Sequence, residues 1–206
     1  MIVGNGPVPE GAAAAMAQAD RVVRFNDCRS FRAGERSDVV AVCNTGRPAR
    51  AMLDGGAWAH HPAVVAARDI WCVRDPAFFA ALRAPLAISH PELDDFCEDG
   101  TPGFEAFALA SAKGVRVLDA SLHSRVVAAL APYAPAGSYV VPSSGLIVIA
   151  ALLEDAPEAD LVLTGFTHQG WDGHPFAAEA RLVESWCRAG RLSRLVEAAP
   201  PRAAQA

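Results

Sequence analysis

Short β-rich runs alternate with alanine-rich helical runs along most of this sequence. The β-rich runs fall at 2–3, 20–26, 38–45, 69–75, 115–119 and 159–166. Helices are predicted at 9–19, from 76 to about 83, and at 106–112, 121–133, 143–155 and 175–188. The β-rich runs are mostly apolar throughout, which is typical of strands covered on both faces. The sequence therefore predicts an α/β fold with a mostly parallel sheet and helices on both of its faces.

The length of 206 residues suits a single domain. We expect this domain to span 1–198 and the segment 199–206 to be a disordered tail. The stretch 84–104 is rich in proline and acidic residues, which predicts an irregular loop or a lid. The formal net charge of -5 argues against a broad basic surface for nucleic acid.

The five cysteines are an odd number and none has C-x-x-C spacing, so neither a disulfide framework nor a zinc ribbon is expected. We expect buried free thiols in a reducing compartment. The chain opens without the basic and apolar segments of a secretory signal. Its longest apolar run, 145–153, is too short to span a membrane. These features predict a cytoplasmic protein.

The segment 2–11 reads as a strand, a glycine turn and the start of a helix. Such a turn lets a ligand approach the backbone, and the helix N-terminus can receive a phosphate, as in Rossmann-like folds. The dinucleotide pattern G-x-G-x-x-G fails, however, because Pro9 stands at its last glycine. The second strand also ends in Asn26, where an acidic residue is usual. An NAD-dependent enzyme, another nucleotide site and a purely structural turn all remain open.

A second candidate site begins at the helix predicted over 143–155. Ser143 or Ser144 is expected to cap this helix, whose free N–H groups attract an anion, although an ordinary cap is the alternative. Further along, Pro175 should hold His174 just outside the last predicted helix. The helix N-terminus favours a neutral imidazole there, whereas Glu179 favours the charged form. A neutral His174 is suited to act as a base. The alternatives are a histidine that only caps the helix and a metal site formed by His168, Asp172 and His174.

These two regions resemble the sialylmotifs of glycosyltransferase family 29. The resemblance to the large motif rests on Gly4, Asn5, Gly6, Gly11, Asp20, Val23, Arg24 and Asn26. The resemblance to the small motif rests on Pro142, Ser143, Ser144, Gly145, Gly165 and Phe166. His174 and Glu179 have the spacing of the very small motif, and His168, Trp171 and Asp172 loosely resemble the short motif upstream of it.

The resemblance implies a sialyltransferase-like variant of the glycosyltransferase A fold. It also implies an inverting transfer of a sialic-acid-type sugar from a CMP donor to an unknown acceptor hydroxyl, without a metal or other cofactor. In that reaction His174 is the base, His168 faces the leaving phosphate, and Glu179 completes the catalytic set. Asn5 and Asn26, with Gly4 and Gly6, hold the nucleotide. Ser143, Ser144 and Gly145 face the donor carboxylate or phosphate.

The chain also departs from that family. Both long motifs lack the cysteine of eukaryotic members, and the sequence contains no stem or membrane anchor. Short bacterial proteins with a similar layout include urease operon accessory proteins. A non-catalytic accessory protein that binds a nucleotide or nucleotide sugar on the same fold is therefore the main alternative. Elsewhere, His60 and His61 predict a surface loop, Glu92, Asp94, Asp95 and Glu98 a solvated charge cluster, and His90 and His123 have no convincing partner.

Overall fold

A computed structural model describes residues 1–135 and 137–195 of the chain. Its single sheet contains β1 (Ile2–Val3), β2 (Val23–Phe25), β3 (Val39–Val42), β4 (Asp69–Cys72), β5 (Gly114–Val117), β6 (Val162–Thr164) and β7 (Ser193–Arg194). The α-helices are α1 (Ala12–Gln18), α2 (Gly46–Leu53), α3 (Pro62–Ala66), α4 (Pro76–Ser89), α5 (Thr101–Ala110), α6 (Ala120–Leu130), α7 (Ser144–Asp155) and α8 (Phe176–Arg188). One 3₁₀ turn, η1, covers Pro91–Leu93.

All strand pairs are parallel, and the strands lie in the order β5-β4-β3-β2-β1-β6-β7. The chain builds the sheet outward from β1 to β5 and then returns to place β6 on the other side of β1. The order therefore reverses between β1 and β6. In open α/β sheets the carboxyl ends of the strands at such a reversal are where ligands bind. The prediction of a Rossmann-like parallel sheet is confirmed.

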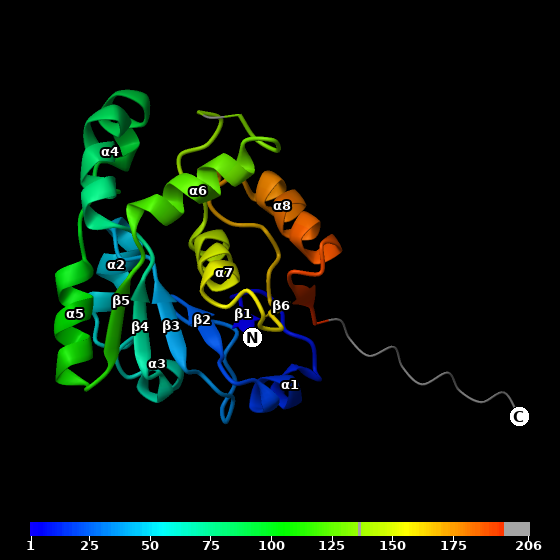
Figure 1. The fold of residues 1–206 in the computed structure, drawn as a ribbon. Helices are drawn as coiled ribbons and strands as arrows, with labels where there is room; N and C mark the ends of the chain where they lie inside the picture. The colour runs from blue at the N-terminus through cyan, green and yellow to red at the C-terminus, as the bar shows by residue number, and fades with distance from the viewer. Residues whose placement is uncertain (136, 196–206) are drawn as a thin grey trace, which may run out of the picture.

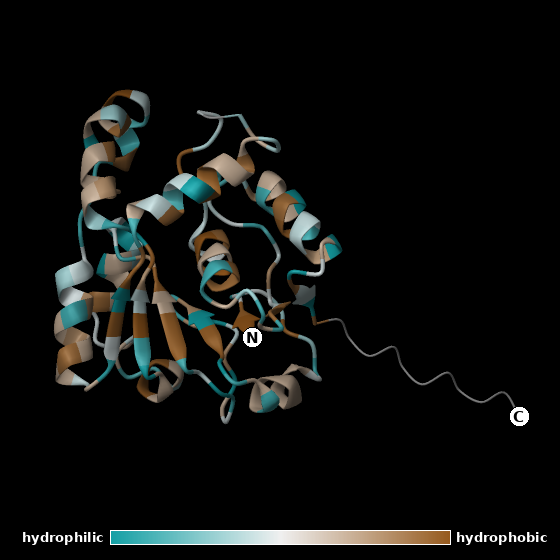
Figure 2. Ribbon diagram, in the orientation of Figure 1, coloured by the Kyte–Doolittle hydropathy of each residue, from teal (hydrophilic) through white to brown (hydrophobic). Residues whose placement is uncertain are grey.

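Helices cover both faces of the sheet, as predicted (Figure 1). Within β3, Val39 and Ala41 pack into the core that includes α6, α7 and α8. Val40 and Val42 point the other way and pack with residues of α2, α3 and α5. Because side chains alternate along a strand, a run without polar residues supplies both faces with core. The strands accordingly form the apolar centre of the molecule (Figure 2).

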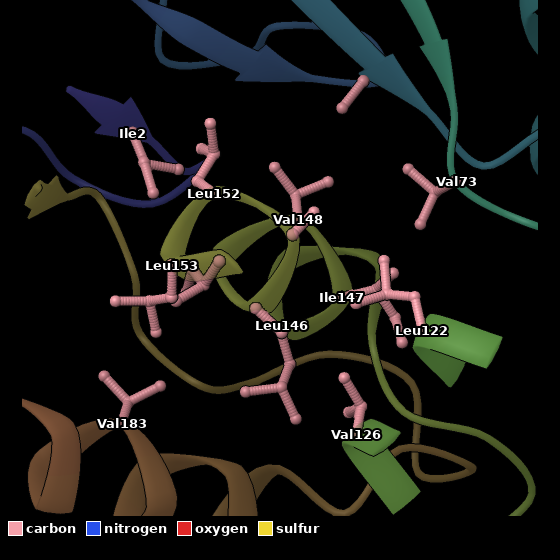
Figure 3. Packing of buried hydrophobic residues seen from close by; sticks show 14 of the residues in the cluster. Ile2, Val73, Leu122, Val126, Leu146, Ile147, Val148, Leu152, Leu153 and Val183 are labelled. Atoms are coloured by element: carbon pink, nitrogen blue, oxygen red, sulfur yellow. The ribbon is translucent and has the colours of Figure 1, made fainter. Parts of the chain in front are cut away.

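Helix α7 is the central element of one of these layers. Every residue from 146 to 153 in it is buried, so the longest apolar run of the sequence is a core helix. Figure 3 shows Leu152 beside Ile2 of the sheet, Leu146 directed toward α8 with Val183, and Ile147 beside Leu122 of α6. A helix that is apolar all round needs such neighbours on every side. This packing fixes the N-terminus of α7 relative to the strand ends.

The prediction for 84–104 was wrong over most of that stretch. Helix α4 continues through Pro85 to Ser89, η1 follows, and α5 begins at Thr101. Pro85 is tolerated inside α4 even though proline lacks the N–H of a helical hydrogen bond. Helix α4 projects away from the sheet (Figure 1), so its exposed side carries alanines without losing core contacts.

Three short elements were missed, and the ends of α5 and α6 differ from the prediction. Helices α2 and α3 and the edge strand β7 were not predicted, because each is short or interrupted by proline or glycine. Asp119 caps α6 by accepting from the Leu122 N–H at 2.9 Å. Ala112, with φ of 53°, reverses the chain after α5, and Gly114 opens β5.

The cysteines of the described residues are free, and all except the half-buried Cys187 are buried, as expected. No helix within residues 1–135 and 137–195 is both long and apolar enough to cross a bilayer. The predicted tail 199–206, together with 196–198 of the predicted domain, lies outside the described residues.

Candidate functional site

A cleft of about 620 Å³ lies at the carboxyl ends of the central strands. That volume is within the ordinary range for small-molecule sites. Its walls include the turns after β1 and β6, the first residues of α7 and α8, and η1. All ten candidate site residues line it: Gly4, Asn5, Gly6, Asn26, Ser143, Ser144, Gly145, His168, His174 and Glu179. The fold therefore brings together two segments that are more than a hundred residues apart in sequence.

The glycines of the first turn pack against the turn after β6. The Gly4 N–H donates to the Thr164 carbonyl at 2.8 Å and the Gly6 N–H to the Gly165 carbonyl at 2.9 Å. A Cβ on Gly4 would lie 2.3 Å from the Gly165 oxygen. Gly165 itself has φ of 69°, a conformation that favours glycine. The close approach that these glycines permit is between two turns of the chain.

Asn5 follows β1 and reaches the end of β2, whereas Asn26 follows β2 and reaches the end of β3, and both line the cleft. Asn5 Nδ2 donates to the Phe25 carbonyl and to Asp27 Oδ1, both at 3.1 Å. Asn26, with φ of 48°, accepts from the Cys43 N–H through Oδ1 at 2.8 Å. Asparagine is one of the few residues that adopt this left-handed conformation readily. Each carboxamide thus joins neighbouring strand ends, and no hydrogen bond to another described residue uses Asn26 Nδ2.

Glu179 is 1% exposed and holds the start of α7. Its carboxylate accepts from the Ser143 N–H at 2.7 Å and from the Ser143 hydroxyl at 2.6 Å. Ser143 in turn caps α7, as predicted, by accepting from the Leu146 N–H at 3.2 Å. Burial raises the pKa of Glu179, while the two Ser143 hydrogen bonds oppose that shift. The Glu179 carboxylate therefore positions α7, and the His174 ring hydrogen-bonds to Val141 instead.

His174 lies between the end of the 140–141 segment and α8. Its Nδ1 is 2.8 Å from the Val141 carbonyl, which can only accept, so Nδ1 carries the proton. Burial, aided by the charge of Arg74, lowers the pKa of His174 to about 4. The neutral ring then presents the Nε2 lone pair, the form that accepts a proton from a hydroxyl. Pro175 caps α8, so His174 lies just outside the helix as predicted.

His168 occupies the turn after β6, with φ of 50°. Its Nε2 accepts from Arg194 Nη2 at 3.1 Å, because a guanidinium can only donate. Burial and the Arg194 charge both lower the pKa of His168. A neutral His168 therefore carries its proton on Nδ1, and Arg194 adds a positive charge at this end of the cleft. Arg194 belongs to β7, which the sequence did not predict.

Arg74, directly after Val73 at the end of β4, is the main cleft residue that sequence reasoning missed. It is 5% exposed, and its guanidinium lies over the Phe79 and Phe96 rings, at 4.7 and 4.5 Å from their centroids. Its Nη1 donates to Thr45 Oγ1 at 2.5 Å. A charged residue ending an apolar strand is a signal that the sequence offered in 69–75.

Phe96 and Trp171 form an aromatic rim beside these groups. Their ring centroids are 5.5 Å apart. Trp171 also packs edge-to-face with His174, with 4.9 Å between the two ring centroids. Asp95, which the sequence predicted to be a solvated acid, instead accepts from Arg47 of α2 at 2.9 Å. Asp94 and Glu98 also form salt bridges to α2. The stretch predicted as a loop or lid is thereby tied to the body of the domain.

The remaining histidines have structural surroundings. His61 caps α3 by accepting from the Ala63 N–H at 3.2 Å, whereas His60 is exposed. His123, for which no partner was expected, is buried with Nε2 2.9 Å from the Val73 carbonyl. Among residues 1–135 and 137–195, no three His, Cys, Asp or Glu side chains come together as a metal site. His168, Asp172 and His174 accordingly do not form one.

Comparison with known proteins identifies a relative but no family model. The chain is 57% identical over 198 residues to the urease operon 23 kDa accessory protein of Rhizobium meliloti strain 1021. These residues make up 95% of this chain and 91% of the relative. No family model matches the sequence, and nothing in these comparisons supports the resemblance to glycosyltransferase family 29. The chain belongs to the family of this urease operon accessory protein.

Proposed function

We propose that the chain acts as an accessory protein of a urease operon and binds a nucleotide or nucleotide sugar of the CMP type in its cleft. The observation that carries the proposal is the gathering of ten residues, chosen from two distant segments of sequence, around one cleft at the β1/β6 reversal. The accessory role is proposed from kinship with the Rhizobium protein. The choice of CMP comes from the resemblance of the asparagines to those of a CMP-sugar site.

The polar groups of the cleft suit such a ligand. Asn26 Nδ2 can donate to a base edge or a ribose, since its Oδ1 is already used by Cys43. The N–H groups of Ser144 and Gly145, at the first turn of α7, have no hydrogen-bond acceptor among the described residues. Helix N-termini of this kind receive phosphates.

A thermal-shift screen with CMP, CDP, UDP and NAD tests the proposal. A ligand at about one hundred times its Kd stabilises the folded state by about 2.7 kcal/mol. For a domain of this size that corresponds to a Tm rise of roughly 5–10 °C. We expect CMP and CDP to give this rise and NAD to give none. Stabilisation by NAD alone would instead assign a dinucleotide enzyme, and no shift with any nucleotide would contradict the proposed ligand.

Sugar transfer is a second candidate function, favoured by the state of His174. Its neutral ring, with Nδ1 bonded to Val141 and no partner for Nε2 among the described residues, suits a base that deprotonates an acceptor hydroxyl. This candidate predicts release of CMP from a CMP-sugar donor. A positioned base contributes about 10²–10⁴-fold, so His174→Ala should nearly abolish release while leaving CMP binding intact. Binding of the donor without release by the wild type would leave the accessory role alone.

A further inference from the structure

We propose that Arg74 is the anion anchor of the cleft and binds a carboxylate or phosphate of the ligand beyond the nucleotide's first phosphate. The proposal rests on the proposed function, because it names a second group that the same ligand carries. It assigns the ligand to a chemical class: a nucleotide linked to a sugar acid, or one with a further phosphate.

The charge of Arg74 has no carboxylate partner among the described residues. None of the salt bridges within residues 1–135 and 137–195 involves it, although its side chain is almost wholly buried. Burying an ion is unfavourable unless the ion is paired and hydrogen-bonded. The two aromatic faces offset only part of this cost, since a cation–π contact is weaker than a buried ion pair with good geometry. A ligand anion would supply the missing partner.

The acids nearest to Arg74 in sequence and in the cleft are engaged elsewhere. Asp75 caps α4 by accepting from the Phe78 N–H at 2.8 Å. Asp95 is held by Arg47, and Glu179 by Ser143. Each carboxylate of the cleft wall therefore has its own donors, and the guanidinium is left for a group that enters from outside.

The donors of Arg74 are held ready by the residues around it. Of its five side-chain N–H donors, the one directed at Thr45 Oγ1 has an acceptor among the described residues. Thr45 and the two phenyl rings restrict the guanidinium, so little rotamer entropy remains to be lost on binding. A planar fork fixed in this way matches the two oxygens of a carboxylate or phosphate.

The strand order separates Arg74 from the proposed nucleotide end. Arg74 follows β4 and Asn26 follows β2, with β3 between them. Neighbouring strands lie about 4.8 Å apart, so the two strand ends are about 10 Å apart. That separation suits a nucleotide at one end of the cleft and a second anionic group at the other. The charge of Arg74 also reaches His174, because it contributes to the lowered pKa of that ring.

The proposal is tested by isothermal titration of CMP, CDP and a CMP-linked sugar acid into the wild type, Arg74→Met and Arg74→Lys. We expect CDP, the sugar-acid nucleotide, or both to bind the wild type at least tenfold more tightly than CMP. Arg74→Met should remove this gain and leave CMP affinity unchanged. Arg74→Lys, which keeps the charge but loses the fork, should keep part of the gain. The exposed Arg32→Met is the matched control and should behave as wild type.

Titrations with inorganic phosphate and acetate, followed by the NMR signals of the His174 side chain, which both proteins contain, make the test independent of any nucleotide. Saturable changes in the wild-type NMR signals that are absent in Arg74→Met would support Arg74 as the anion anchor. If these changes occur but no nucleotide binds, the proposed nucleotide site fails and the anion site stands. The arm with the tighter binding distinguishes phosphate from carboxylate. Equal shifts in the wild type and Arg74→Met, or an equal loss of CMP and CDP affinity in that variant, would overturn the proposal.

Discussion

The buried carboxylate of Glu179 accepts two hydrogen bonds from Ser143, one from its backbone N–H and one from its hydroxyl. This pair joins the first turn of α8 to the first turn of α7, the two helices whose N-termini border the cleft. The H-x-x-x-x-E spacing of the sequence therefore marks two separate tasks. His174 faces the cleft, whereas Glu179 positions α7.

Removing the Glu179 carboxylate should destabilise the protein. In Glu179→Ala the Ser143 N–H and hydroxyl lose their buried acceptor, and each unsatisfied donor costs about 1–3 kcal/mol. We expect a loss of about 2–4 kcal/mol in the free energy of unfolding, measured by urea denaturation. Glu179→Gln keeps one acceptor oxygen and should lose less. Equal stability of both variants and the wild type would show that this pair does not hold α7.

The state of His174 predicts how stability depends on pH. Its pKa is about 4 in the folded protein, against 6.5 for an ordinary histidine. Between these values the unfolded chain takes up a proton that the folded chain does not, so stability falls as the pH falls from 6.5 to 4. The difference amounts to about 3 kcal/mol.

His174→Gln should remove this part of the pH dependence, as measured by urea denaturation at several pH values. A residual slope is expected, because burial also lowers the pKa of His123 and is the main cause of the lowered pKa of His168. The exposed His60→Gln serves as the control and should keep the full slope. An unchanged slope in His174→Gln would mean that the folded protein holds His174 at an ordinary pKa.

Two glycines of the first turn region provide a matched pair of substitutions. A Cβ on Gly4 would meet the Gly165 oxygen at 2.3 Å, whereas a Cβ on Gly11 would meet nothing within 4 Å. Because neither backbone group at the Gly4 contact can move freely, Gly4→Ala should cost at least about 2 kcal/mol. Gly11→Ala should be neutral or slightly stabilising. Comparable Tm values for the two variants would contradict the close packing of the β1 and β6 turns.

Arg24 matches the resemblance to the large sialylmotif but lies away from the cleft. Its Nη2 contacts Glu35 Oε2 at 2.8 Å, with the two side chains 1% and 5% exposed. Breaking a buried ion pair from one side leaves an uncompensated charge and costs about 3–5 kcal/mol. We expect a loss of that size in Glu35→Gln by chemical denaturation. The CMP affinity of folded Glu35→Gln should equal that of the wild type. If Glu35→Gln is as stable as the wild type, the buried ion pair does not stabilise the protein.

The sheet was predictable because its strands are apolar runs buried on both faces. Strand β7, in contrast, has two residues, Ser193 and Arg194, and pairs with β6 at the edge of the sheet. Helix α4 extends past Pro85, where local rules favour an end, and Leu86 beyond it packs in a buried cluster with Phe96 and Cys97. Elements whose stability comes from tertiary contacts leave little trace in a sequence.

Most residues of the candidate site were predictable from the sequence, whereas the hydrogen bonds that connect them were not. Asn5 and His174 stand beside glycine or proline signals that sequence reasoning can read. Arg74 stands beside none, and its significance depends on having no acidic partner among the described residues, which only the folded chain reveals. The partner of Glu179 likewise lies 36 residues away, at Ser143.

We propose that the cleft binds a CMP-type nucleotide through the strand ends at the β1/β6 reversal. Isothermal titration of CMP into the wild type and Asn26→Asp tests this binding site. The variant keeps the Oδ1 acceptor for the Cys43 N–H and tolerates the left-handed backbone, but replaces the Nδ2 donor, which no described residue accepts from, with a charged oxygen. The exposed Gln18→Glu makes the same chemical change outside the cleft. We expect CMP to bind the wild type and Gln18→Glu but not Asn26→Asp. Equal affinity in all three proteins, or no binding to the wild type, would contradict the proposed site.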